Sequence, residues 1–173
     1  MARPVDPSRR AATLAKAAAY VLEHGLADLS LRPLAKALGT SPRMLLYDFG
    51  SKERLIHEIL AEIRRHETSL LEADVHSLDD VWHWISAPER ERFLRLFFEI
   101  YIDALGREEA QPLVRDWLAY LQERWTPPTD AATATLMIAV VRGLLLDRLA
   151  TGDRARTDEA FRRFSELLGD ARR

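Results

Sequence analysis

The fold is decided by residues 30–53, SLRPLAKALGTSPRMLLYDFGSKE. Two short helical stretches, each with a proline in its first turn, flank a turn that contains Gly39. The spacing predicts a helix near 31–38, a tight turn, and a second helix near 43–48. Two short helices joined in this way form a helix-turn-helix. The apolar residues expected to lock the two helices together are Leu34, Leu38 and Leu45.

The second of these helices is expected to present polar side chains outward, as a recognition helix does in the major groove of DNA. Arg43 can donate to guanine, and Tyr47 can reach a phosphate. Lys52 opens the next helix, where free backbone N–H groups attract phosphate. The same pattern also fits the alternative of an αα-hairpin whose basic face is solvated and does not bind DNA. The predicted DNA-binding residues are Arg32, Thr40, Ser41, Pro42, Arg43, Met44, Tyr47 and Lys52.

Charge is distributed unevenly along the chain. The net charge is −2 overall, but residues 1–66 carry +4 and residues 67–173 carry −6. Lys and Arg side chains that neutralise phosphates supply most of the non-specific affinity of a DNA-binding protein. A basic first segment joined to an acidic remainder therefore favours a protein whose first part meets DNA.

The remainder of the chain reads as helical, because apolar residues recur at helical spacing and no stretch alternates as a strand does. We predict an all-α fold of about nine helices. A three-helix head that contains the helix-turn-helix is expected at 1–51, and a helical body that starts with a long fourth helix is expected at 52–173. Pro127-Pro128 predicts a linker. The other predicted helices lie at about 6–24, 52–73, 78–86, 88–105, 109–125, 130–150 and 157–168.

Several short motifs occur together at fixed positions. The segment from Ala17 to Leu55 combines His24-Gly25 with SLRPLA at 30–35, LGTS at 38–41 and LLYDFGSKE at 45–53. In this order and spacing they resemble the DNA-binding domain of the TetR/AcrR family of transcriptional regulators, over about the first 60 residues. Beyond that region the resemblance rests on the number and length of the helices.

The resemblance implies a homodimeric repressor that binds a partly palindromic double-stranded operator and is released by a small-molecule effector. The chain departs from the family pattern at Leu46, where an aromatic is common, and at Asp48, where Tyr or His is common. A carboxylate repels phosphate unless it pairs with Arg43 or Lys52 or points away, so we expect no contact between Asp48 and the DNA backbone. A solvated tail, with a minor-groove arm as the alternative, is expected of Arg3, Arg9 and Arg10.

The stretch 136–146, LMIAVVRGLLL, is apolar on nearly every side and therefore too apolar for the surface of a monomer. Burial within the chain would also cover it. The resemblance implies instead that the last two helices pair with their symmetry mates in a four-helix bundle, with Gly143 permitting close approach. The predicted dimer-interface residues are Val140, Gly143, Leu144, Phe161, Phe164 and Leu168.

The stretches 88–105 and 109–125 are rich in aromatic residues. Such residues commonly form core. The resemblance implies that the body holds an effector cavity, and cavities of this kind are lined by apolar and aromatic groups. We therefore expect an apolar or aromatic effector. The candidate pocket residues are Ile63, His66, Phe97, Tyr101, Trp117, Leu121 and Met137.

Several classes of protein are disfavoured. The chain has no cysteine, which excludes disulfides and thiolate sites. Glu62 and His66 share a helix face, but no second pair stands at ligand spacing, so we predict no metal and no cofactor. We find no catalytic motif and expect no enzyme. Without a signal peptide or long apolar run, a cytoplasmic protein with no membrane contact is expected. The alternatives are a helical ligand- or partner-binding protein without DNA binding, and a helical enzyme.

Overall fold

A computed structural model of the protein describes residues 6–26, 29–72, 77–125 and 129–170. These residues form helices and turns without any strand, which confirms the predicted all-α fold. The chain divides into two compact units, residues 1–74 and residues 75–173. The first unit extends beyond the head predicted at 1–51, because the long fourth helix packs on the first and third helices.

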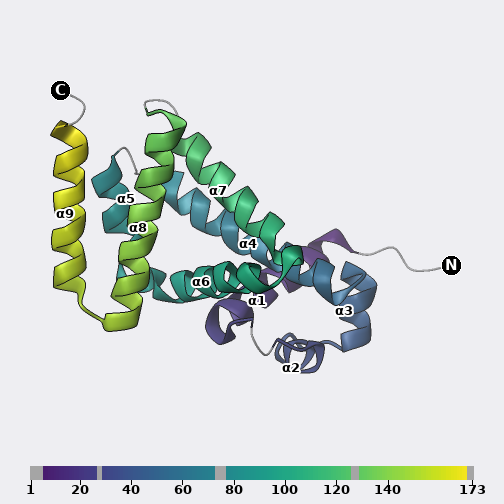
Figure 1. Ribbon diagram of the computed structural model, residues 1–173. Coiled ribbons are helices and arrows are strands. Elements are labelled where there is room, and N and C mark those ends of the chain that lie inside the picture. The colour runs from purple at the N-terminus through teal and green to yellow at the C-terminus, as the bar shows by residue number, and fades with distance from the viewer. Residues whose placement is uncertain (1–5, 27–28, 73–76, 126–128, 171–173) are drawn as a thin grey trace. The chain divides into compact units, whose positions relative to one another are not determined.

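The first unit contains α1 (Pro7–His24), α2 (Leu31–Ala37), α3 (Pro42–Phe49) and α4 (Lys52–Glu72). Within it, α1 packs along α4, and α3 contacts both α2 and α4 (Figure 1). Each fully buried aliphatic side chain contributes roughly 1.5–3 kcal/mol relative to an exposed one. The largest side chains at the centre of this unit, each at most 1% exposed, are Val21, Leu34, Leu45, Leu55 and Ile59.

The ends of these helices follow the local signals in the sequence, with one exception. The Asp6 carboxylate accepts hydrogen bonds from the amides of Ser8 and Arg9, at 3.0 and 3.3 Å, and so caps α1. The Ser41 hydroxyl caps α3 by accepting from the amide of Met44. Ser30 precedes α2 with the extended backbone of a cap residue, but its side chain makes no capping bond.

The second unit contains α5 (Leu78–Ile85), α6 (Glu91–Gly106), α7 (Gln111–Trp125), α8 (Ala131–Thr151) and α9 (Arg154–Asp170). Single 3₁₀ turns, η1 (Pro88–Arg90) and η2 (Glu108–Ala110), precede α6 and α7. Helix α8 lies beside α9 on one side and contacts α6 and α7, while α5 packs on α9 (Figure 1). The predicted helix starts at 88 and 109 thus correspond to 3₁₀ turns that lead into the α-helices.

The last helix begins earlier than predicted. The sequence places its start at Thr157, but α9 begins at Arg154 because Asp153 is the actual cap and accepts from the amide of Arg156 at 3.1 Å. Thr157 is fully buried, and its hydroxyl donates to the backbone carbonyls of Asp153 and Arg154. Thr157, which was expected to start the helix, therefore lies within its first turns and in the interior of the unit.

Nine α-helices lie within the described parts of the chain, the predicted number. The linker predicted at Pro127-Pro128 falls outside those parts. None of the described helices is both long and apolar enough to span a membrane.

Candidate nucleic-acid interface

The predicted helix-turn-helix is present as α2, a turn and α3 (Figure 1). Leu34 and Leu45 are almost fully buried in the first unit. Gly39 lies in the turn with a φ of 66°, a left-handed conformation that glycine adopts without strain. The amide of Thr40 then donates to the carbonyl of Ala35 at 2.9 Å and closes α2. The angle between the two helices is thereby set by the packed leucines and a glycine turn.

The outer face of α3 is accessible. Arg43 is exposed, Tyr47 is 46% exposed and Met44 is half-buried. The Ser41 hydroxyl accepts from the amide of Met44 at 3.2 Å, so it caps α3 and still has a hydrogen to donate. Contact with DNA stays a prediction for all of these positions. Of the remaining predicted contacts, Arg32 is exposed, and the half-buried ones are Thr40, Pro42 and Lys52.

Lys52 stands at the start of α4, where the helix dipole is positive. The Ser51 hydroxyl accepts from the amide of Arg54 at 3.2 Å, which caps this helix. The carboxyl of the neighbouring Glu53 accepts a hydrogen bond from its own amide and one from the Ser51 side chain. These bonds, the amide's first, hold the pKa of the Glu53 carboxyl below its usual value. The first turn of α4 therefore carries two cations, Lys52 and Arg54, and one anion, Glu53, and Lys52, as the first residue of the helix, is the group that suits a phosphate.

Asp48 turns its carboxylate into the first unit, where its side chain is only 3% exposed. This agrees with the expectation that it points away from DNA, but its partner is neither Arg43 nor Lys52. Nη2 of Arg9 donates to Oδ1 of Asp48 at 2.7 Å. Arg9 lies 39 residues earlier in the chain, and no local signal in the sequence links the two.

Arg9 and Arg10 correct a second expectation. Both belong to α1, which begins at Pro7, and not to a solvated tail. Each also makes an ion pair inside the first unit. Nη2 of Arg10 donates to both carboxylate oxygens of Glu58, at 2.6 and 2.7 Å. Arg3, the third arginine of the expected tail, lies outside the described residues.

Three of the predicted pocket residues come together in the second unit. The rings of Phe97 and Trp117 lie 5.5 Å apart, and those of Phe97 and Tyr101 lie 5.9 Å apart. The guanidinium of Arg142 from α8 stands over the Tyr101 ring at 4.6 Å. Leu121 in α7 is half-buried, and Met137 in α8 is buried. In the first unit Ile63 is buried and His66 is exposed, and their part in a pocket stays a prediction.

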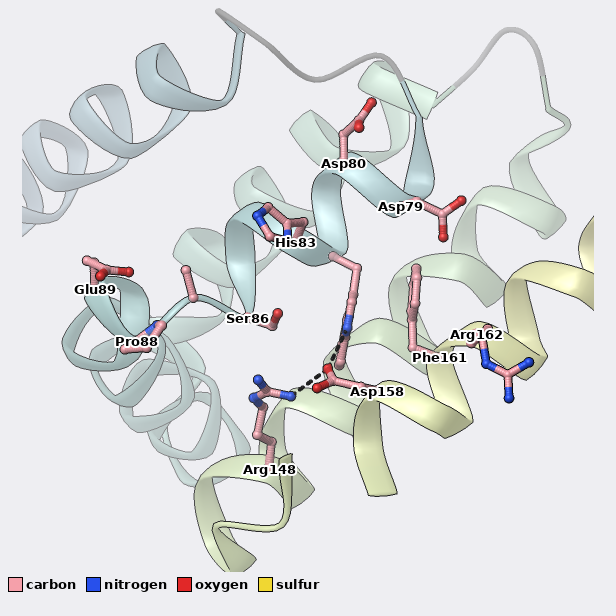
Figure 2. A pocket seen from close by; sticks show the side chains of 12 residues that line it. Asp79, Asp80, His83, Ser86, Pro88, Glu89, Arg148, Asp158, Phe161 and Arg162 are labelled. Atoms are coloured by element: carbon pink, nitrogen blue, oxygen red, sulfur yellow. Dashed lines mark hydrogen bonds and ion pairs between the residues drawn. The ribbon is translucent and has the colours of Figure 1, made fainter. Parts of the chain in front are cut away.

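An open groove of about 780 Å³ in the second unit has no counterpart in the sequence analysis. It lies between α5 and the paired helices α8 and α9 (Figure 2). Trp82 stacks on Phe161 at 4.6 Å and donates from Nε1 to Asp158 at 2.9 Å, and Nη1 of Arg148 donates to the same carboxylate at 2.7 Å. These contacts join residues up to 79 positions apart, which local patterns in the sequence do not reveal.

The predicted dimer residues lie on α8 and α9, and their part in an interface stays a prediction. Gly143 is exposed, and four others are half-buried: Val140, Leu144, Phe164 and Leu168. Phe161 is only 3% exposed and stacks on Trp82 within the unit. Exposed leucines that the sequence analysis did not select are Leu136, Leu146 and Leu167.

Glu62, which shares a helix face with His66, makes an ion pair with Arg65. Among the described residues, no group of three or more His, Asp or Glu side chains is placed to hold a metal ion.

Residues 14–59 match the family model of bacterial regulatory proteins, tetR family. Several solved structures resemble the whole chain. A transcriptional regulator from Streptomyces coelicolor A3(2) is 25% identical, with a TM-score of 0.72 over 92% of this chain and 99% of its own. A TetR-family regulator from a Rhodococcus species is 22% identical, with a TM-score of 0.68 over 95% and 98%. No curated protein matches the sequence of this chain.

A third similar structure is the multidrug binding protein EbrR in complex with imidazole. It is 23% identical to this chain, with a TM-score of 0.71 over 91% of this chain and 90% of its own. EbrR in complex with proflavin is similar to the same extent, with a TM-score of 0.69 and 22% identity. At this level of identity the likeness concerns the fold.

Proposed function

Because the chain is a transcriptional regulator of the tetR family, identified by its helix-turn-helix domain at residues 14–59, we propose that it is a repressor released from its operator by a small molecule. The operator is a partly palindromic duplex, read by the α3 helices of two protomers in successive major-groove segments. A repressor of this kind acts on DNA within the cell, so the location that goes with the proposal is the cytoplasm. The functional division runs between a head at 1–51 and an effector-binding and dimerising body at 52–173.

The observation that carries the DNA-binding role is the exposed face of α3 on a rigid support. Arg43 and Tyr47 project from a helix whose inner face is buried. Lys52 sits one turn later, at the positive end of α4. A base-reading cation on a fixed helix and a cation suited to phosphate are the two elements that sequence-specific binding combines.

The effector role is supported by the aromatic cluster of α6 and α7. The Phe97 ring lies within stacking range of both Tyr101 and Trp117, and the Arg142 guanidinium covers the Tyr101 ring. Such rings favour flat aromatic molecules, which stack on exposed ring faces. EbrR, which shares the fold, is a multidrug binding protein solved with proflavin. A ligand shifts DNA affinity only if it favours one conformation of the dimer over the other.

The DNA-binding role is tested by selection and titration. The purified protein is used to enrich duplexes from a randomised library, and its affinity for the enriched duplex and for a scrambled duplex of equal length is measured at several salt concentrations. We expect a palindromic motif to be enriched, and the log of the affinity to fall linearly with the log of the salt concentration. A protein that enriches no sequence and binds without salt dependence is not a DNA-binding repressor.

A further inference from the structure

The C-terminal end of the recognition helix is tied to the start of α1 by two consecutive arginines. Arg9 donates from Nη2 to the Asp48 carboxylate at 2.7 Å. Arg10 donates from Nε to the backbone carbonyl of Asp48 at 3.0 Å, and its guanidinium stands 4.5 Å over the ring of Phe49. Both attachments fall on the last two residues of α3. Glu58 on α4 holds the other end of Arg10.

These contacts satisfy groups that would be costly to leave without partners. The Asp48 side chain is 3% exposed, whereas that of Arg9 is 44% exposed. A carboxylate buried without a cation loses its hydration and receives nothing in return, so it stays buried only while Arg9 is beside it. The carbonyl of Asp48 belongs to the last turn of α3, where carbonyls have no partner within the helix and favour a cation. Arg9 therefore supplies the cation that the Asp48 carboxylate needs, and Arg10 supplies the donor that the Asp48 carbonyl needs.

The position of this attachment matters for recognition. Tyr47 on the accessible face of α3 directly precedes Asp48, and α3 is only eight residues long. A helix of only two turns has little stability of its own, so the contacts that hold its two ends matter. Its first end is held by the glycine turn and the Ser41 cap. We propose that Arg9 and Arg10 are positioning residues for the recognition helix, which hold its second end through Asp48. The proposal rests on the DNA-binding function proposed above.

The test relies on two effects that change DNA affinity in opposite directions, the loss of a negative charge and the loss of helix positioning. Asp48→Asn removes a negative charge from the DNA-binding unit, so electrostatics alone would leave DNA affinity unchanged or raise it. Loss of positioning instead lowers affinity for the selected duplex while sparing the scrambled one. We expect the ratio of the two affinities to fall roughly tenfold, the scale of one hydrogen bond to a charged group. The ratio cancels the phosphate contribution, which is common to both duplexes.

The matched control is Glu23→Gln, which removes one negative charge from an exposed position on α1 and is expected to leave the ratio unchanged. Circular dichroism at the assay temperature establishes that each variant is folded, because a purely structural role for the pair moves the melting temperature and leaves the ratio alone. An Asp48→Asn protein that is folded and keeps the ratio of the unmodified protein overturns the proposal.

Two variants of Arg9 decide the matter if Asp48→Asn does not fold. Arg9→Lys keeps a cation beside Asp48, and Arg9→Gln does not, so we expect the lysine variant to retain more of the ratio. Equal ratios in the two variants overturn the positioning role. If the unmodified protein selects no duplex, the proposed function fails. If it selects one and the variants match it, only this inference fails.

Discussion

Lys52 and Arg43 are both cations on the first unit, but their surroundings assign them different tasks. Lys52 lies at a helix start, where backbone N–H groups and the helix dipole add to its charge. Arg43 is exposed on α3, the helix that enters the groove in this class of fold. Phosphates are identical in every DNA sequence, whereas base edges differ. Substituting Lys52 should therefore change the affinity for all duplexes, and substituting Arg43 should change the preference among them.

We expect Lys52→Ala to weaken binding to every duplex alike and to reduce the slope of log affinity against log salt by about one unit, because one phosphate contact is lost. Arg43→Ala should relax the preference at one base pair by roughly 1–3 kcal/mol. Affinity titrations against single-substituted duplexes at several salt concentrations measure both effects. Arg65→Ala, further along α4, is the control and should leave the slope unchanged. An unaltered slope in Lys52→Ala would remove that residue from the phosphate contacts.

Among the helices, α6 and α7 carry the surface that we propose for a flat ligand. Trp117 lies 5.4 Å from Phe93 and 5.5 Å from Phe97, so one side chain of α7 joins two rings of α6. Trp84 offers a comparison, because it is half-buried on α5 and is covered by Arg90 at 4.6 Å. The two tryptophans thus differ in their aromatic neighbours more than in their exposure.

Removing Trp117 should therefore weaken the binding of an aromatic cation. We expect Trp117→Ala to raise the Kd for proflavin up to about tenfold, since one aromatic pair contributes roughly 0.5–1.5 kcal/mol beyond its buried area. Titration followed by the fluorescence of proflavin gives the Kd, and Trp84→Ala is the matched substitution that should leave it unchanged. Equal affinity in both variants would place the ligand away from α6 and α7.

The start of α8 provides a pH-dependent element. Asp130 accepts from the amides of Ala132 and Thr133 at 2.9 and 3.0 Å and from the Thr133 hydroxyl at 2.7 Å. The hydrogen bond from the Thr133 hydroxyl, followed by that from the Thr133 amide, lowers the pKa of Asp130 below its usual value. A carboxyl with a lowered pKa in the folded state stabilises the fold above its unfolded pKa, and this stabilisation is lost as the pH falls through the folded one.

We therefore expect Asp130→Ala to lower the Tm at neutral pH, and the difference from the unmodified protein to shrink at pH values below the ordinary aspartate pKa of about 3.9. Asp130→Asn keeps one oxygen to accept from the amides of Ala132 and Thr133, but its NH2 group cannot accept from the Thr133 hydroxyl, so its Tm at neutral pH should lie between those of Asp130→Ala and the unmodified protein. Thermal melts across the acid range measure these differences. A gap that is constant with pH would show that ionisation of Asp130 does not matter to the cap.

At the scale of the whole molecule, the proposed homodimer depends on the apolar surface of α8. Leu136 and Leu146 are 53% and 46% exposed, and Gly143 is exposed on the same helix. Their spacing of three or seven residues places them on one side of an α-helix, as a helix-pairing surface requires. A second copy of the chain is the partner that closed two-fold symmetry supplies.

A carboxylate in this surface should prevent pairing, because it would be buried without a partner cation. We expect Leu146→Glu to yield monomers where the unmodified protein forms dimers, and to weaken operator binding because the two α3 helices are no longer coupled. Leu105→Glu, at a more exposed leucine of α6, is the control and should remain dimeric. Molar mass by light scattering across a concentration series reports the outcome. A dimeric Leu146→Glu protein would exclude this part of α8 from the interface.

The all-α fold, the helix-turn-helix and most helix ends could be predicted from the sequence, because each depends on residues a few positions apart. Asp6, Gly39 and Ser41 act on their own neighbours, and those neighbours are visible in the chain order. The pairing of Asp48 with Arg9 and the stacking of Phe161 on Trp82 became known from the folded structure alone. Helical spacing tells which residues share a face, but the partner of a face is settled by the packing of segments far apart in the sequence.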